Sequence, residues 1–269
     1  MAESKTAEPR RALITGGANG FGLAIARSLV AQGAHVAIAD VNAERLKEAT
    51  QILAGANVLP IELDVSSARS VQSAVESCKS TFGGLDTLVN SAGVIHIAPL
   101  AEVTERDWDR VLDIDLKGVF LCCQSAAPLL CESGRGRIVN IGSDASKLGC
   151  GMLVAYCAAK FGVVGLTKAL AAELAPNQVT VNCVCPVGVS STGMGQDVLS
   201  WKTKKVGAKP RDILAATAAG IPLQRNATTE DIVNAVMFFL AERSNFLTGL
   251  ALDVDGGLLS VMPMPGAAN

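Results

Sequence analysis

A tyrosine and a lysine four residues apart, Tyr156 and Lys160, are the side chains of this sequence best suited to proton transfer. Tyr156 is the only tyrosine, and residues 153–170 are rich in Ala, Leu and Val without a proline, which favours a helix. Residues four apart share a helix face, so the ammonium of Lys160 can lie beside the phenol. That charge lowers a tyrosine pKa, and the phenol can then exchange a proton with an alcohol near neutral pH. A surface pair without function has the same spacing.

A glycine-rich turn follows the first apolar run, residues 12–15, and precedes a helical pattern that Gly33 ends. Such a turn lets the backbone approach a pyrophosphate, and the helix N-terminus adds N–H donors. The spacing is Gly-x-x-x-Gly-x-Gly rather than G-x-G-x-x-G, and a glycine loop without a ligand is the alternative. The candidate cofactor-binding residues of this turn are Gly16, Asn19, Gly20, Phe21 and Gly22.

An acidic residue, Asp40, ends the second predicted strand, residues 35–39. An acid there can hydrogen-bond both hydroxyls of an adenosine ribose and repels a 2′-phosphate. Neither the glycine turn nor Val41 offers a Lys or Arg for such a phosphate. We therefore expect NAD rather than NADP. The alternative is an ordinary strand-end or capping acid, since Asn42 and Glu44 begin a helix.

Strands and helices alternate along the chain, with helices expected at 43–54 and 67–82 and strands at 57–63 and 85–89. Ser66 is the expected cap of the second helix. This alternation predicts an α/β fold with a Rossmann-like, doubly wound, mainly parallel sheet flanked by helices on both faces. Ligands bind such sheets at the carboxyl ends of the strands. Further candidate cofactor residues at strand ends are Asp64, Val65, Asn90, Ala92 and Gly93.

A long helix, approximately 104–131, and a strand, 137–141, lead to Ser143, which precedes Tyr156 by 13 residues. In this order the motifs resemble those of the short-chain dehydrogenase/reductase family. The resemblance covers roughly residues 10–258, closing with 253–257. The motifs that carry it are Thr15-Gly16-x-x-x-Gly20-x-Gly22, Asp64-Val65, Asn90-x-Ala92-Gly93, Ser143 and Tyr156-x-x-x-Lys160.

The resemblance implies one dehydrogenase domain over residues 1–269 that interconverts a secondary alcohol and a ketone by hydride transfer with NAD, without a metal. Tyr156 would be the general acid/base, and Lys160 would lower its pKa and bind the nicotinamide ribose. Ser143 would hold the substrate oxygen. A strand-end hydroxyl that satisfies a backbone group is the alternative for Ser143.

Two positions depart from the family pattern. Asp115 stands where the family usually has an asparagine that positions a water in a proton relay with the lysine. An ionised Asp accepts but cannot donate a hydrogen bond, and its charge can shift the coupled pKa of Lys160. We expect Asp115 to act in catalysis with an altered pH profile. Ser91 replaces a second frequent asparagine, which a small hydroxyl tolerates.

The loop after the expected strand 178–185 also resembles the family, with one extra residue. The resemblance implies that Thr192, or failing that Ser191, contacts the nicotinamide carboxamide; a polar turn is the alternative. Pro186, Gly188 and Val189 complete the expected cofactor loop.

Residues 188–220 are the expected substrate lid, because long polar segments between elements often cover a site. The small and apolar side chains around the cleft suggest a secondary alcohol or ketone, cyclic or aryl-substituted. Lys202, Lys204, Lys205 and Lys209 can meet an anionic substrate, but a solvated lysine face is the simpler account. His96 is as easily structural. The candidate substrate-binding residues are Ser143, Ala145, His96, Met152, Met194 and Trp201.

Composition limits the other classes of function. The 269 residues are 49% hydrophobic and 18% charged, with a net charge of −2, so no basic excess indicates nucleic acid or an anionic membrane. Eight cysteines without a CxxC pair and two histidines without zinc-ligand spacing indicate reduced thiols in a cytoplasmic protein. We expect no signal peptide or membrane span. A flexible N-terminus, 1–10, and a tail, 259–269, should flank the domain.

The resemblance further implies a homotetramer that packs through helix 229–242, the helix of Tyr156 and the last strand. Two other functions stay open. A ketoacyl thioester reductase of the same family would prefer NADPH and would need a basic patch to dock its carrier. Asp40 argues against this alternative. An NAD-binding sensor with weak catalysis would keep the cofactor groove but would have lost the oxidoreductase activity.

Overall fold

A single seven-stranded sheet runs through the protein, in a computed structural model that describes residues 8–55 and 57–261. The strand order is β3-β2-β1-β4-β5-β6-β7, and every neighbouring pair is parallel. The order reverses between β1 and β4, where doubly wound sheets form their ligand crevice. The strands are β1 Arg11–Thr15, β2 His35–Asp40, β3 Val58–Glu62, β4 Thr87–Asn90, β5 Arg137–Ile141, β6 Thr180–Pro186 and β7 Ala251–Val254.

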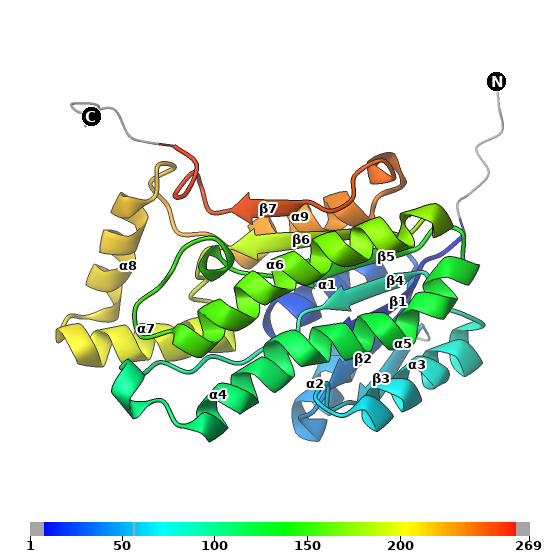
Figure 1. Cartoon of the computed structure of the whole chain (residues 1–269), viewed down its shortest axis with the longest axis horizontal. Coiled ribbons are helices and arrows are strands. Elements are labelled where there is room, and N and C mark those ends of the chain that lie inside the picture. The colour runs from blue at the N-terminus through cyan, green and yellow to red at the C-terminus, as the bar shows by residue number, and fades with distance from the viewer. Residues whose placement is uncertain (1–7, 56, 262–269) are drawn as a thin grey trace.

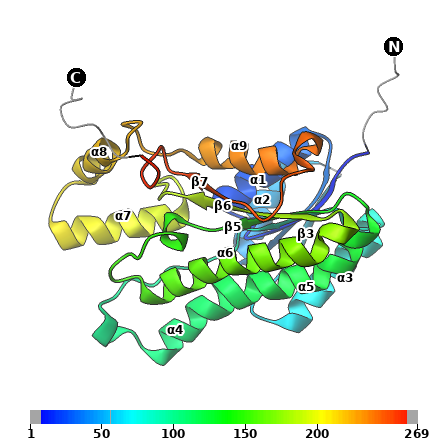
Figure 2. The ribbon, with the colours of Figure 1, turned by 45° about the horizontal axis from the view of Figure 1, so that its top comes forward.

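Helices cover both faces of this sheet, as the alternation of elements predicts (Figures 1 and 2). One face carries α1 Gly20–Ala31, α2 Ala43–Leu53 and α9 Thr229–Leu240, which pack through residues such as Ile25, Leu46 and Phe239. The opposite face carries α3 Ala68–Phe82, α5 Gly118–Glu132 and α6 Val154–Leu174, which pack through residues such as Val71, Val119 and Val163. The predicted fold class is confirmed.

The long helix expected at 104–131 is interrupted in the middle. Here α4 Glu105–Leu112 passes through a π-helical turn, Asp113–Lys117, before α5 begins. The extra residue of a π turn rotates the side chains that follow, and such turns are frequent at functional sites. This turn places Asp115 in the interior with no exposed surface. Apolar periodicity does not reveal a one-residue insertion.

The cap of α3 also differs from the expectation. Ser67, not Ser66, caps the helix, because its hydroxyl accepts the N–H of Ser70 at 3.4 Å. The hydroxyl of Ser66 instead donates to the carboxylate of Asp64 at 2.6 Å.

The segment expected as a lid forms two helices, α7 Gly193–Val206 and α8 Pro210–Gly220, beyond the carboxyl ends of the strands (Figure 1). Thr192 caps α7, and Pro210 begins α8 at a position where a missing N–H costs nothing. The four lysines of this segment are all exposed, in agreement with a solvated face.

The described end of the N-terminal segment is tied to the sheet. Arg135 donates to the carbonyl oxygens of Glu8 and Pro9, both at 3.0 Å, and Arg10 pairs with Glu242 at 2.6 Å. Residues 8–10, the described part of the expected flexible N-terminus, therefore contact the rest of the domain. Residues 1–7 and most of the expected tail, 262–269, lie outside the described residues.

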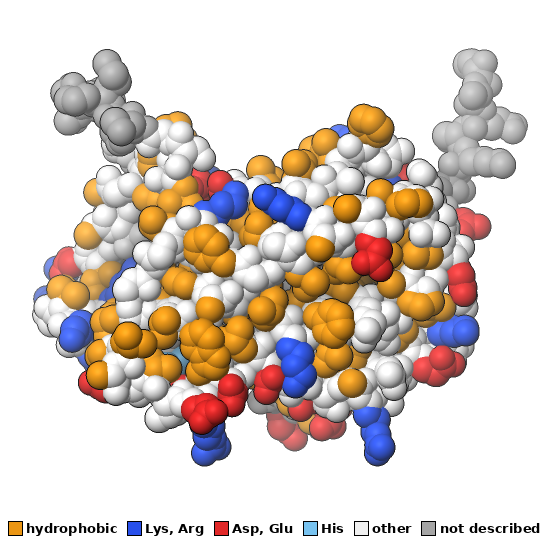
Figure 3. Space-filling view, in the orientation of Figure 1, with side chains coloured by type: hydrophobic (Ala, Val, Ile, Leu, Met, Phe, Trp, Pro, Cys, Tyr) orange, Lys and Arg blue, Asp and Glu red, His pale blue; other side chains and the backbone are white. Residues whose placement is uncertain are grey.

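Two helical stretches of the described chain, Glu105–Glu132 and Val154–Asn177, are long and apolar enough to span a membrane by length and composition alone. Both also supply side chains to the core beneath the sheet, which accounts for much of their apolar character. Their outward face nevertheless carries apolar groups, which gather across the middle of Figure 3, and Phe120 and Phe161 are 42% and 47% exposed.

Candidate active site

Tyr156 and Lys160 lie one turn apart on α6, and both are buried, with 7% and 4% of their surface exposed. The Lys160 ammonium lies 5.5 Å from the centre of the Tyr156 ring, as their spacing predicts. It donates to the carbonyl oxygen of Ile141, the last residue of β5, at 3.1 Å. The helix and the end of β5 therefore hold this cation in place.

Asp115 is the third member of this buried group. Its Oδ2 lies 3.2 Å from Lys160 Nζ, and its Oδ1 accepts the N–H of Val94 at 2.8 Å. Gly93 makes room for the pair, because a β-carbon there would stand 3.0 Å from Asp115 Oδ2. The π turn thus brings a carboxylate to the cation that the sequence pairs with Tyr156.

Charges and burial act against one another at Tyr156. Burial raises the pKa of Tyr156, Lys160 lowers it, and the carboxylate of Asp115 raises it again. The net direction is upward, so the prediction of a lowered pKa is wrong in its sum, although Lys160 acts with the predicted sign. Burial works to lower the pKa of Lys160, but Asp115 and Tyr156 outweigh it and the pKa is raised. Lys160 is therefore firmly cationic.

Ser143 follows β5 and begins a short 3-10 turn, Asp144–Ser146. Its hydroxyl donates to Asp144 Oδ1 at 2.7 Å and accepts the N–H of Ala145 at 3.1 Å, while its own N–H donates to Ser146 Oγ at 3.0 Å. A hydrogen bond with Ser143 also works to lower the pKa of Tyr156. Ser143 thus lies close to Tyr156, and its contact with the substrate oxygen stays a prediction. Asp144 is not among the residues predicted for the site, although an acid directly after the serine is a signal visible in the sequence.

The glycine turn between β1 and α1 is closely packed. A β-carbon on Gly22 would collide with the carbonyl oxygen of Gly16, which itself has φ of +63°. The hydroxyl of Thr15 accepts the N–H groups of Ser91 and Ala92 at 3.1 and 3.2 Å, so this turn is joined to the loop after β4.

Asn19 caps α1, because its side-chain oxygen accepts the N–H of Gly20 at 2.7 Å and its carbonyl oxygen accepts that of Leu23 at 3.2 Å. The N–H groups of Phe21 and Gly22 have no acceptor within the helix. They fit an anionic group such as a pyrophosphate.

Asp40 lies at the side of this turn. Its Oδ2 accepts the N–H of Ala18 at 3.3 Å, and its Oδ1 accepts the N–H of Asn42 at 3.0 Å. The neighbouring loop is placed by Asp64, which accepts the N–H of Ser66 at 2.9 Å, and by Val65, whose side chain fills the space next to Gly118. Asp40 is therefore joined directly to the glycine turn, and the loop of Asp64 and Val65 follows the neighbouring strand β3.

Three polar side chains cross the sheet in one register, Thr15 of β1, Asn90 of β4 and Asn140 of β5. Asn90 donates to Asn140 Oδ1 at 2.8 Å, and Asn140 donates to the hydroxyl of Thr167 on α6 at 2.9 Å. The buried Oδ1 of Asn90 has no partner among the described residues. An orphaned acceptor at the switch point fits a ligand with donor groups. Neither Asn140 nor Thr167 is among the residues predicted from the sequence, although Asn140 is a polar residue inside an apolar strand.

The loop after β6 closes over the glycine turn. Pro186 ends β6, Gly188 is exposed and Val189 is buried, and the carbonyl oxygen of Val189 accepts the hydroxyl of Thr192 at 3.0 Å. The side chain of Thr192 stands 3.6 Å from the position of a β-carbon on Gly20.

Thr192 and Ser191 are the two candidates for contact with the nicotinamide carboxamide, and the Ser191 hydroxyl points towards α9. This hydroxyl lies 3.1 Å from that of Thr229 at the start of α9. The position of Thr192 beside the glycine turn favours Thr192.

The side facing α7 is rich in apolar groups and sulfur. The Tyr156 hydroxyl lies 4.0 Å from the sulfur of Met194, and Trp201 follows seven residues later on the same helix face. Ala145 packs in the cluster that holds Tyr156. Met152 has φ of +68°, and its carbonyl oxygen accepts the N–H of Ala98 at 3.0 Å.

His96 is held from the side of α4. Its Nδ1 lies 3.8 Å from Asp107, and its Nε2 is buried without a partner among the described residues.

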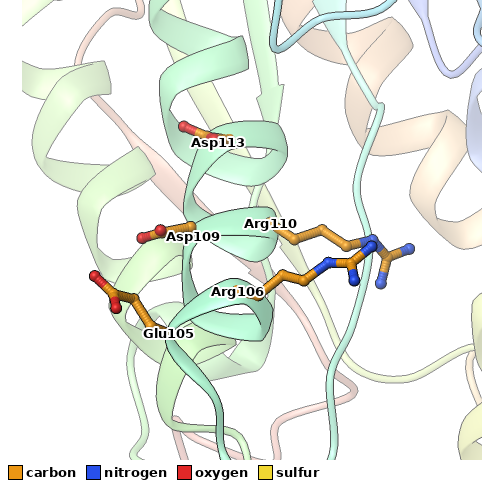
Figure 4. A pocket seen from close by; sticks show the side chains of 5 residues that line it. All are labelled: Glu105, Arg106, Asp109, Arg110 and Asp113. Carbon is orange, nitrogen blue, oxygen red and sulfur yellow. The ribbon is translucent and has the colours of Figure 1, made fainter.

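A separate hollow of about 460 Å³ lies on the surface of α4, and its lining includes no residue predicted for the site. Figure 4 shows Arg106 and Arg110 extending to one side of the helix and Glu105 and Asp109 to the other. Within residues 8–55 and 57–261, no group of three His, Cys, Asp or Glu side chains is placed to hold a metal ion. The Tyr156 region remains the candidate active site.

The doubly wound sheet with its glycine turn places the chain in the class of Rossmann-like α/β proteins. A family model described as enoyl-(acyl carrier protein) reductase matches residues 16–259. 2-(S)-Hydroxypropyl-CoM dehydrogenase 3 of Xanthobacter autotrophicus is 37% identical over 250 residues, which cover 92% of this chain and 96% of the relative. D-Threitol dehydrogenase of Mycolicibacterium smegmatis is 39% identical over 248 residues, 91% of each chain.

A solved structure of actinorhodin polyketide ketoreductase with NADPH has a TM-score of 0.88 and 33% identity, and the match covers 93% of this chain and 97% of that one. The chain belongs to the short-chain dehydrogenase/reductase family and is an oxidoreductase.

Proposed function

We propose that this protein is an NAD-dependent oxidoreductase that interconverts a secondary alcohol and a ketone, with Tyr156 as general acid/base. The observation that carries the proposal is the buried pair of Tyr156 and Lys160 with Ser143 beside the phenol, at the carboxyl edge of β5. The two dehydrogenases that resemble the chain are named for substrates with secondary hydroxyl groups, hydroxypropyl-CoM and threitol, which supports this substrate class.

Each side chain then has a task. In alcohol oxidation Tyr156 takes the hydroxyl proton, and Ser143 donates a hydrogen bond to the same oxygen, which polarises the carbonyl in the reverse direction. Lys160 stabilises the phenolate, and it stays charged because Asp115 raises its pKa. The chemistry that a nicotinamide supplies when bound is hydride transfer to or from the carbinol carbon.

The choice of NAD rests on Asp40. Its carboxylate lies at the edge of the glycine turn, where it would accept the hydroxyls of an adenosine ribose and repel a 2′-phosphate. The first turn of α1 would hold the pyrophosphate, and Thr192 the carboxamide. Lys160 would bind the nicotinamide ribose.

A ketoacyl thioester reductase is the second candidate. Exposed Lys202, Lys204 and Lys205 on α7 offer a basic patch for an acidic carrier. The polyketide ketoreductase that resembles this chain holds NADPH, which also favours this candidate. Asp40 opposes it.

We also propose a cytoplasmic homotetramer. The described cysteines are all free, which fits a reducing compartment. Apolar side chains remain exposed on the elements expected at the interfaces, namely Phe161 of α6 at 47%, Phe238 of α9 at 40% and Leu252 of the edge strand β7 at 39%. Light scattering tests the assembly, and a monomeric mass would refute it.

The test of function is the absorbance of the reduced nicotinamide with a panel of secondary alcohols, ketones and ketoacyl thioesters, each with both cofactors. We expect NAD-dependent alcohol turnover that Tyr156→Phe abolishes. A preference for NADPH with thioesters supports the second candidate. Binding of NAD without turnover on any compound would make the protein a sensor and refute the proposed function.

A further inference from the structure

Two half-buried cysteines, Cys150 and Cys157, lie together at the start of α6, and neither has a task in the proposed chemistry. The N–H of Cys150 donates to the sulfur of Cys157 at 3.3 Å, and that sulfur donates to the carbonyl oxygen of Cys150 at 3.8 Å. Cys157 directly follows Tyr156 in the first turn of α6, and both pack in the same cluster.

The Cys150 thiol donates to the carbonyl oxygen of Leu148 at 3.7 Å, and the segment before α6 must release this contact to bring the two sulfurs together. The segment turns directly into the helix, because the N–H of Leu153 donates to the carbonyl oxygen of Cys150 at 3.2 Å and the N–H of Cys157 donates to that of Leu153 at 2.8 Å. Gly149 and Gly151 flank Cys150 and have open space where a β-carbon would stand. Glycines on both sides permit the small backbone movement that disulfide geometry requires.

We propose that Cys150 and Cys157 form an oxidative modification site, at which a hydroperoxide converts the two thiols to a disulfide that ties residues 149–152 to the first turn of α6. One thiolate attacks the peroxide, the O–O bond breaks, and water or an alcohol leaves while that sulfur becomes a sulfenic acid. The second sulfur then attacks it, the S–S bond forms, and the sulfenic hydroxyl leaves as water with the remaining thiol proton. Two electrons pass from the sulfurs to the peroxide.

The groups around Cys150 set the pH dependence of this reaction. Partial burial, the carboxylate of Asp144 and the Cys157 thiol raise the pKa of Cys150, while Lys202 of α7 works to lower it. The attacking species is the thiolate, so cross-linking should accelerate as the pH rises above neutral.

The disulfide would act on the candidate site through the loop that it closes. Residues 148–153 separate Ser143 from Tyr156, and Leu153 and both cysteines pack in the cluster that contains Tyr156. This effect rests on the proposed function. Since displacement of a positioned group by about 1 Å can cost 100-fold, we expect cross-linking to lower kcat/KM for alcohol oxidation by about tenfold.

The test is hydrogen peroxide titration of the full chain, followed by trypsin digestion and mass spectrometry. Cleavage after Lys147 and Lys160 gives one peptide, 148–160, that holds both cysteines and no other. We expect this peptide to lose two hydrogens, reversibly with a dithiol reductant. Cys150→Ser and Cys157→Ser should each prevent the loss, and Cys131→Ser on α5 is the matched control.

Two outcomes would overturn the site. One is a peptide 148–160 that only gains oxygen, and the other is oxidation confined to peptide 169–202, where Cys183 and Cys185 have sulfurs 3.7 Å apart. Complete cross-linking without a change in turnover would refute the coupling to the active site. Reduced protein that turns over no substrate would count against the proposed function alone, because the mass shift is measured independently.

Discussion

Replacement of Asp115 by asparagine is expected to move the rising limb of kcat/KM for alcohol oxidation to lower pH. The limb follows deprotonation of the Tyr156–Lys160–Asp115 group, in which the carboxylate raises the pKa of Tyr156. Asparagine keeps the shape and an oxygen for the N–H of Val94, so the fold should survive. The substitution removes a negative charge that opposes formation of the phenolate.

The size of the shift follows from the distances. Lys160 Nζ and Asp115 Oδ2 are 3.2 Å apart. At an effective dielectric constant of about 20, unit charges at that distance attract by about 5 kcal/mol before desolvation is subtracted. If the Tyr156 phenolate is taken at about twice that distance from Asp115, their repulsion is about 2.6 kcal/mol, or about two pH units. Asparagine also weakens the hold of Lys160 on its proton, which opposes the shift, so we expect a net displacement of about one pH unit.

The assay is the initial rate of nicotinamide reduction by wild type, Asp115→Asn and Asp113→Asn. The pH runs from about 6 to about 11, a range that includes the ordinary tyrosine pKa of about 10. Asp113 lies in the same π turn, but its side chain is 45% exposed and pairs with Lys117 at 3.0 Å, so its replacement should leave the limb in place. An unshifted limb in folded Asp115→Asn would refute the electrostatic reasoning. A shift of equal size in Asp113→Asn would do so as well.

Three further changes test other parts of the structure. Gly22→Ala should lower the free energy of unfolding, measured by urea denaturation, by about 1–3 kcal/mol, because the new β-carbon meets the carbonyl oxygen of Gly16. The control is Gly165→Ala, in open space on α6, which should raise the free energy of unfolding by up to about 1 kcal/mol. Equal effects of the two changes would contradict the close packing. Asp40→Ala should lower the preference for NAD over NADP by about 10- to 100-fold, since a charged hydrogen bond and the repulsion of a 2′-phosphate are lost. The control, Glu62→Gln at the neighbouring strand end, should leave this preference unchanged. The preference is measured as the ratio of the kcat/KM values with the two cofactors. Asp231→Asn should destabilise α9 by less than about 1 kcal/mol at pH 7, and the effect should fade as the pH falls below about 4 towards the depressed folded-state pKa of Asp231. The sign follows because hydrogen bonds from Arg225 and Thr228 depress the pKa of Asp231, so its contribution is present above the unfolded pKa and is lost as the pH falls; a constant difference across that range would exclude this linkage.

The elements that the sequence predicts well are those with strong local signals. Alternating apolar runs and glycine turns predict the sheet and its two helical layers, and Tyr156 and Lys160 face each other because the helix period leaves no other arrangement. The π turn at Asp113–Lys117 was missed because one additional residue per turn changes the apolar pattern too little to be recognised.

Electrostatic sums were harder to predict than positions. The spacing of Lys160 predicts the sign of its effect on Tyr156, but the net pKa depends on burial and on Asp115, which long-range packing brings close. The chain from Asn90 through Asn140 to Thr167 likewise joins β4, β5 and α6. Such contacts between distant residues leave no periodic trace in the sequence.

The most direct test of the account is the fate of the hydrogen on the carbinol carbon. With a secondary alcohol deuterated at that carbon and NAD, we predict transfer of the deuterium to the cofactor, a primary isotope effect, and a loss of turnover of at least about 100-fold in Tyr156→Phe with NAD binding retained. Undiminished deuterium transfer by folded Tyr156→Phe would contradict the central claim that Tyr156 moves the proton.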